Sequence, residues 1–313
     1  MTIGLLTASY ITSSVLFILA LGGLSNQEKA KRAVWYGIVG MVIAVAATIF
    51  GNKVFLTEWL NWLIGAIVVG SLIGAIVAKK VQMTGMPQLV AALHSFVGLA
   101  AVFIGINSAM LPHTEMSSSQ LIIHNIEVFI GVFIGAITFT GSIIAFGKLS
   151  EIITGKALIL PGRHALNLIM LFSCLILGYM FLNDSGNWTL IAMTLIAFII
   201  GAHLVLAIGG ADMPVVVSML NSYSGWAAAA TGFMLGNDLL IVTGALVGSS
   251  GAILSYIMCK GMNRSFFNVI LGGFGATEQS SSSQNKEQRP VKSGNADDAA
   301  FLMKNASSVI IVP

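Results

Sequence analysis

Charged residues are scarce in this chain, at 9% of its 313 residues, whereas a soluble domain carries about 25%. Hydrophobic residues make up 56%, and the mean hydropathy is +0.91. This shortage of charge excludes an ordinary soluble domain and indicates an integral membrane protein surrounded by the lipid bilayer. The net charge of +3 says little by itself, and we expect no nucleic-acid partner.

Cysteine is rare too, and the motifs of common catalytic sites are missing. Cys174 and Cys259 both fall in apolar runs, which is typical of small buried hydrophobes rather than of a disulfide or metal pair. The sequence has no Walker motif, no complete Gly-x-Gly-x-x-Gly, no nucleophile elbow and no paired Cys or His at metal-ligand spacing. The glycine-rich segment 272–275 follows no predicted strand, so we interpret it as a hinge. We therefore predict no catalytic residue, bound cofactor or metal site within this chain.

Long apolar runs are what the chain has in abundance. Nine runs are each about long enough to cross a bilayer as a helix, the form that satisfies its own backbone hydrogen bonds inside lipid. They cover residues 3–24, 34–51, 59–78, 87–107, 122–146, 165–183, 188–208, 213–235 and 238–259. The sequence thus predicts an all-α membrane protein, with a bundle of about nine transmembrane helices in residues 1–262.

The loops between these runs alternate in charge. Basic residues occupy the first, third and fifth loops and the segment after the last run: Lys29, Lys31, Arg32, Lys79, Lys80, Lys148, Lys156, Arg163, Lys260 and Arg264. The intervening loops hold one base, Lys53. Because basic loops stay in the cytoplasm, this pattern predicts an N-terminus outside and a C-terminus in the cytoplasm.

Beyond residue 262 the composition becomes polar. Residues 263–297 are interpreted as a hinge and a flexible cytoplasmic linker, since 277–295 is a polar stretch of low complexity. Asp297–Lys304 has the acidic start of a short helix, and Ser308–Pro313 reads as a buried parallel strand. We expect residues 298–313 to begin an α/β domain that is truncated in this chain.

His94 is the most informative side chain in the apolar runs. It lies roughly 10–18 Å from the nearer end of its run, at ~1.5 Å per residue. An ionisable group at that depth is costly and normally faces a bundle interior or a wet cavity, and histidine exchanges a proton near neutral pH. Two interpretations remain open from this residue: a step in a proton pathway, or a neutral histidine satisfied by a neighbouring helix.

Other polar residues lie at comparable depth. Asn221 is about 12 Å and Ser142 about 8 Å from the cytoplasmic ends of their runs. The Asn221 amide is able to orient the His94 ring or relay through water, whereas the Ser142 hydroxyl either holds water or bonds its own helix backbone. Asp212 either stabilises the start of its helix or pairs with Arg264.

Roles for two more titratable residues stay open. His203 is an ordinary histidine near a span end, and Glu127 either admits protons or is a solvated edge residue. Glycines four residues apart, Gly70/Gly74, Gly131/Gly135 and Gly244/Gly248, predict tightly packed helix pairs.

Long blocks of the chain resemble a known family, the beta subunit of the proton-translocating NAD(P) transhydrogenase. The resemblance runs from end to end and is sharpest in Ala211–Trp226, Gly244–Tyr256, Asn263–Ser265, Leu93–Ala101 and Thr138–Lys148. It implies an enzyme of the bacterial inner (plasma) membrane that passes hydride from NADH to NADP+ while protons move inward.

The resemblance also implies partners and site residues. A separate alpha subunit binds NAD(H), the C-terminal domain of beta binds NADP(H), and the complete assembly is a dimer. The family's proton-pathway residues match His94, Asn221 and Ser142, and its coupling residues match Asp212 and Arg264. Its first NADP(H)-domain strand matches Ser308–Pro313, and the chain ends before the nucleotide turn, so no cofactor-binding residue is carried over.

Two rival functions remain at this point. A proton-coupled carrier for a small solute predicts a solute pocket near the membrane midplane and broken helices, but no long internal repeat of the kind that such carriers often show is apparent. A structural membrane anchor is the third possibility, against which a histidine and an asparagine at matched depth argue mildly.

Overall fold

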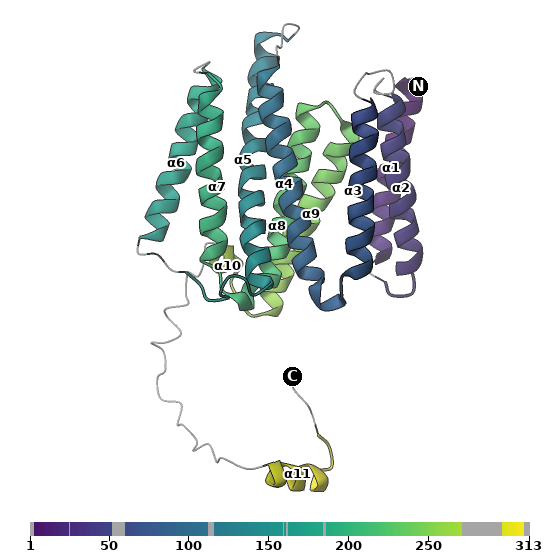
Figure 1. Cartoon of the computed structure of the whole chain (residues 1–313), viewed down its shortest axis with the longest axis vertical. Helices are drawn as coiled ribbons and strands as arrows, with labels where there is room; N and C mark the ends of the chain where they lie inside the picture. Colours follow the sequence, from purple (N-terminus) through teal and green to yellow (C-terminus); the bar gives the residue numbers. More distant parts are fainter. Residues whose placement is uncertain are drawn as a thin grey trace. The chain divides into compact units, whose positions relative to one another are not determined.

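The computed structural model describes residues 3–24, 26–51, 60–111, 116–158, 160, 162–183, 186–270 and 296–309. Nine long helices stand side by side in the first of two compact units, which spans residues 1–273 (Figure 1). They are α1 (Ile3–Leu24), α2 (Ala30–Gly51), α3 (Leu60–Lys80), α4 (Met86–Met110), α5 (Ser118–Leu149), α6 (Arg163–Leu182), α7 (Trp188–Leu206), α8 (Met213–Met234) and α9 (Asp238–Gly261). Short helices are η2 (Met83–Gly85), η3 (Gly210–Asp212), α10 (Phe266–Ile270) and α11 (Ala296–Asn305). The described residues contain no strand.

Residues that favour a helix start, a proline or a capping side chain, stand at the beginnings of several helices. Pro87 stands in the first turn of α4, where its missing N–H costs nothing. Ser117 caps α5 through a reciprocal pair of hydrogen bonds with Gln120, and the Asn237 side chain accepts from the backbone N–H of Leu240 at the start of α9.

Eight of the nine long helices are long and apolar enough to cross a membrane, which confirms a multi-pass membrane protein by length and composition. The exception is α8, which is 22 residues long but carries polar residues along its length. Most of α8 is buried, and it packs against α4, α5 and α9. A helix enclosed by other helices needs no apolar outer surface, which accounts for its composition.

The helices at the centre of the bundle approach closely at glycines. A Cβ atom on Gly98 of α4 would lie 2.6 Å from the carbonyl oxygen of Gly135 on α5. A Cβ on Gly225 of α8 would collide with the backbone of Gly248 on α9. The tight packing predicted for Gly131/Gly135 and Gly244/Gly248 is therefore confirmed.

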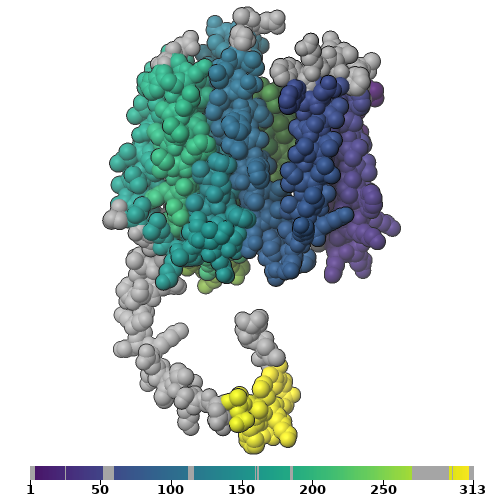
Figure 2. All heavy atoms as spheres, in the orientation of Figure 1, coloured from purple at the N-terminus to yellow at the C-terminus, as the bar shows by residue number. Residues whose placement is uncertain are grey.

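The first three helices form a looser region. α1 packs against α2, whereas α3 has no buried residue, and no described atom lies within 4 Å of a Cβ placed on Gly70 or Gly74. An apolar cavity of about 700 Å³ lies between α1, α2, α3 and α9. Figure 2 shows the cleft between α3 and α4, with α9 visible at its base. The packing expected at Gly70/Gly74 is not formed within the described residues.

The second compact unit, residues 274–313, is described only around α11. The helix predicted over Asp297–Lys304 is confirmed by α11. The hinge glycines 272–275, nearly all of the predicted linker beyond α10, and residues 310–313 of the predicted strand lie outside the described residues.

Candidate functional site

The His94 side chain crosses from α4 to α8. Its Nδ1 atom lies 3.0 Å from the Ser224 hydroxyl oxygen, and that hydroxyl donates to the backbone carbonyl of Asn221 at 2.8 Å. Sequence analysis did not single out Ser224, although it lies three residues after Asn221 and so on the same face of α8. The structure thus brings His94 and Asn221 together through a serine.

The hydrogen bond from Ser224 to Asn221 is compatible with one form of the neutral imidazole. A serine hydroxyl has one proton, and a carbonyl oxygen only accepts. While Ser224 donates to Asn221, the ring must donate from Nδ1 to Ser224, which leaves Nε2 as the unprotonated nitrogen. Nε2 is buried and forms no hydrogen bond to the described residues. The site therefore presents one basic nitrogen, held in place from the opposite side of the ring.

The Asn221 side chain is directed toward α9. Its Nδ2 atom would lie 3.1 Å from a Cβ atom on Gly251, so the amide occupies the space that this glycine leaves. The neighbouring serines on α8 tie the same two helices together, since Ser218 donates to Gly251 and Ser222 to Gly248. Asn221 is therefore connected to the His94 ring through its backbone carbonyl and Ser224, not through its side-chain amide.

Ser142 is completely buried in α5, and its hydroxyl forms no hydrogen bond to the described residues. Thr138 on the same helix behaves differently, because its hydroxyl donates to the carbonyl of Ile134 one turn earlier. Bonding to its own helix backbone, one of the two alternatives for Ser142, is therefore absent in the described structure. A buried hydroxyl without a protein partner retains its capacity to bond water.

The two predicted coupling residues form an ion pair. Arg264, just beyond α9, donates from a guanidinium nitrogen to a carboxylate oxygen of Asp212 in η3 at 2.8 Å. The ion pair with Arg264, one of the two alternatives for Asp212, is therefore formed, and Asp212 makes no side-chain capping bond to α8. The hydrogen bond and the charge of Asp212 raise the pKa of Arg264 above its ordinary value. Arg264 therefore stays charged throughout the physiological range.

The end of α9 aims Arg264 at its partner. Asn263 adopts a left-handed conformation with φ of 53°, and the Arg264 N–H bonds back to the carbonyl of Cys259 at 2.9 Å. This is the Schellman type of helix ending, in which Asn is one of the few residues that tolerate the left-handed position. The turn reverses the chain so that Arg264 faces η3.

Lys148 has a role that its position in the sequence does not indicate. The sequence predicts a loop residue, but α5 continues to Leu149, and Lys148 is only 5% exposed. Its ammonium group donates to the carbonyls of Val205, Leu206 and Ile208 at 3.2, 2.8 and 2.6 Å. A buried cation at a helix C-terminus bonds the carbonyls at the end of the helix and complements the helix dipole. Lys148 thus fixes the turn that leads from α7 to Asp212.

Two other described histidines, His203 and His124, bond to partners outside the His94 site. His203 on α7 bonds through Nδ1 to the side-chain oxygen of Asn167 on α6 at 2.7 Å. His124 on α5 bonds to Ser108 on α4 at 3.0 Å, a contact that the sequence does not indicate.

Glu127 is half-buried on α5. Cys174 and Cys259 are free and buried, as expected for small hydrophobes.

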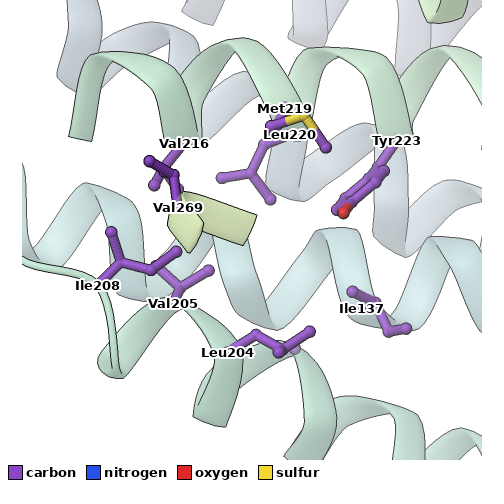
Figure 3. Close-up of a pocket in the computed structure, with 10 residues that line it drawn as sticks. Ile137, Leu204, Val205, Ile208, Val216, Met219, Leu220, Tyr223 and Val269 are labelled. Carbon is purple, nitrogen blue, oxygen red and sulfur yellow. The ribbon is translucent and has the colours of Figure 1, made fainter. Parts of the chain in front are cut away.

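A narrow apolar crevice separates α5, α7 and α8 (Figure 3). Its cavity volume is about 30 Å³, and ten residues line it: Ile137, Gly201, Leu204, Val205, Ile208, Val216, Met219, Leu220, Tyr223 and Val269. Tyr223 and Ile137 lie at one end, and Val216, Ile208 and Val269 gather at the other (Figure 3). A Cβ on Gly141, the residue before Ser142, would contact Leu220 and Val205 at 3.2 Å, so the crevice runs beside that part of α5.

Comparisons with known proteins show the family of the chain. The family described as "NAD(P) transhydrogenase beta subunit" matches residues 6–313. The chain is 52% identical over 317 aligned positions to "NAD(P) transhydrogenase subunit beta" of Rhodospirillum rubrum, and the match covers 100% of this chain and 68% of that protein. A protein with the same name from a defined strain of Rhodospirillum rubrum gives the same values.

Proposed function

We propose, on the premise that this chain belongs to the NAD(P) transhydrogenase beta subunit family, that its helix bundle carries the enzyme's proton across the membrane. Hydride would pass from NADH to NADP+ in the complete enzyme while the proton moves inward. His94 is the residue that takes and releases the proton.

The observation that carries this proposal is the environment of the His94 ring. Nδ1 is held by Ser224, and Nε2 remains a buried base without a protein partner in the described chain. A proton carrier in a membrane needs such a group, because a fully satisfied histidine has no free site for a proton. In this proposal Asn221 positions the ring through Ser224, and Ser142 supplies a hydroxyl along the route.

The topology proposed for this function has nine spans. In this topology α8 crosses the membrane in addition to the eight apolar helices. Asp212 and Arg264 then lie at the same end of the bundle as Lys79, Lys80 and Lys156. By the positive-inside rule that end is cytoplasmic, and the N-terminus is outside. The membrane is the bacterial inner (plasma) membrane.

The nucleotides would be bound outside the described residues. None of those residues forms a strand followed by a glycine-rich turn, the arrangement that cradles a dinucleotide phosphate, so no residue here is assigned to a cofactor. We assign NADP(H) to a C-terminal domain that residues 298–313 begin, and NAD(H) to an alpha subunit partner in a dimeric assembly. The pair Asp212–Arg264, at the junction between bundle and C-terminal segment, transmits the nucleotide state to the proton route.

The solute-carrier alternative gains no support from the continuity of the central helices. Such carriers place their site at interrupted helices, whereas α4, α5, α8 and α9 each run without a break between their bounds.

The first test replaces His94 by alanine in the complete enzyme in vesicles supplied with NADH and NADP+. We expect proton uptake to be abolished and coupled hydride transfer to fall with it. His203→Ala is the matched control, because it removes another buried histidine that bonds an asparagine rather than Ser224. Normal proton uptake by an assembled His94→Ala enzyme would remove His94 from the route.

A further inference from the structure

The short helix α10 has two different sides. Val269 is only 4% exposed and packs in a cluster with Val215 and Cys259, while Phe267, two residues earlier, is 71% exposed. The buried side chain is also the one residue of α10 that lines the crevice between α5, α7 and α8. Figure 3 shows Val269 beside Val216 at one end of that crevice.

On the basis of the proposed function, we propose that Val269 is a hydrophobic plug that closes the inner end of the proton route between α7 and α8. The crevice leads from Tyr223, the residue before Ser224 in the sequence, to Val216 near the start of α8. Seven residues of helix separate these two, a length of ~10.5 Å.

The dimensions of the crevice show that it is closed. A hydrogen-bonded file over that length requires about four waters at ~2.8 Å spacing. A cavity of about 30 Å³ accommodates only two or three, since one water needs ~10–15 Å³ by this measure. The side chains that line it are apolar except for Tyr223. Constrictions of this kind block ions and protons by excluding water.

The position of α10 connects the plug to the coupling pair. Val269 comes five residues after Arg264, and the Val269 N–H bonds to the carbonyl of Ser265, directly after that arginine. The ion pair with Asp212 fixes where α10 begins relative to α8. A rearrangement at Arg264 therefore moves Val269 directly, and withdrawal of its side chain widens the crevice between Val216 and Ile208.

The test measures passive proton leak in vesicles that contain the complete enzyme, under an imposed pH gradient and without nucleotides. We expect Val269→Ser to raise the leak about tenfold, the factor that corresponds to ~1.4 kcal/mol. Phe267→Ser is the matched control on the same helix and is expected to leave the leak unchanged. An unchanged leak in assembled Val269→Ser enzyme would overturn the plug.

A second measurement tests whether water and water-soluble reagents enter the crevice, and it does not depend on enzyme activity. Leu220→Cys places a thiol inside the crevice, and a membrane-impermeant methanethiosulfonate reagent is added from the α10 side. We expect labelling about tenfold faster when Val269→Ser is also present, and equal rates would contradict the plug. The blank is the Val269→Ser enzyme without Leu220→Cys, because Cys259 packs in the same cluster as Val269 and loses part of its cover in that variant.

Adding His94→Ala to Val269→Ser separates the two proposals. Loss of the leak supports both a plug at Val269 and a route through His94. A leak that persists, together with faster Leu220→Cys labelling, keeps the plug and overturns the assignment of the proton route to His94.

Discussion

At the residue scale, one hydroxyl decides how the His94 ring is used. Ser224 lies between the ring and the Asn221 carbonyl, and while its single proton is donated to that carbonyl, Nε2 is the unprotonated ring nitrogen. The sequence indicated the depth of His94 and Asn221, because depth depends on position within a run. It did not indicate Ser224, because serine is common in helices and only the packing of α4 against α8 gives this one its partner.

Replacing Ser224 by alanine should therefore slow proton transfer without disturbing the fold. A hydrogen bond to a ring that becomes charged is worth about 1.5–3 kcal/mol, so coupled proton uptake should fall about tenfold or more. Ser224→Thr keeps the hydroxyl and should retain most of the rate. The control is Ser249→Ala on α9, whose exposed hydroxyl bonds its own helix backbone. Uptake at the parental rate in Ser224→Ala enzyme would show that the ring is positioned by other contacts.

At the element scale, the sequence predicted most of the helices but not how they pair. Apolar runs and caps set the spans, because each depends on residues near in sequence. The predicted run 122–146 is shorter than α5, since Lys148 is typical of a loop until its three carbonyl partners at and just beyond the end of α7 are known. The same glycine spacing also occurs in two different environments. Gly244 and Gly248 pack against α8, whereas no described atom lies within 4 Å of a Cβ placed on Gly70 or Gly74.

This difference gives a paired prediction. Gly225→Ala adds a methyl group that collides with the Gly248 backbone, and overpacking of this kind costs about 1–3 kcal/mol. Gly74→Ala adds the same methyl group where no described atom lies within 4 Å. Thermal unfolding of the two purified variants should show a lowered midpoint for Gly225→Ala only. A similar loss in Gly74→Ala would reveal a close neighbour for α3 in the assembled enzyme.

At the scale of the whole molecule, the distribution of charge sets the orientation. Burial of Lys148 removes one cation from its loop, but Lys156 and Arg163 remain beyond the same end of α5, so the predicted sidedness is unchanged. The charge bias acts on segments near the span ends, which is why a sequence alone is able to predict it.

Labelling with an impermeant maleimide would measure that orientation in intact cells and in inverted vesicles. Cysteine introduced at Lys156 should react only in inverted vesicles, and cysteine introduced at Ser118, at the opposite end of α5, only in intact cells. The reversed pattern would invert the topology and place Arg264 outside. Reaction of both from one side would mean that α5 does not cross the membrane.

The uncovered helix α3 has a practical consequence for handling this enzyme. With no buried side chain, α3 gains little from its neighbours in the chain and depends on surrounding hydrocarbon, in which a helix is the form that satisfies every backbone group. Solubilisation replaces that hydrocarbon by detergent. The choice of detergent, and how much native lipid it carries along, will therefore decide whether α3 stays folded or becomes the first segment open to proteases.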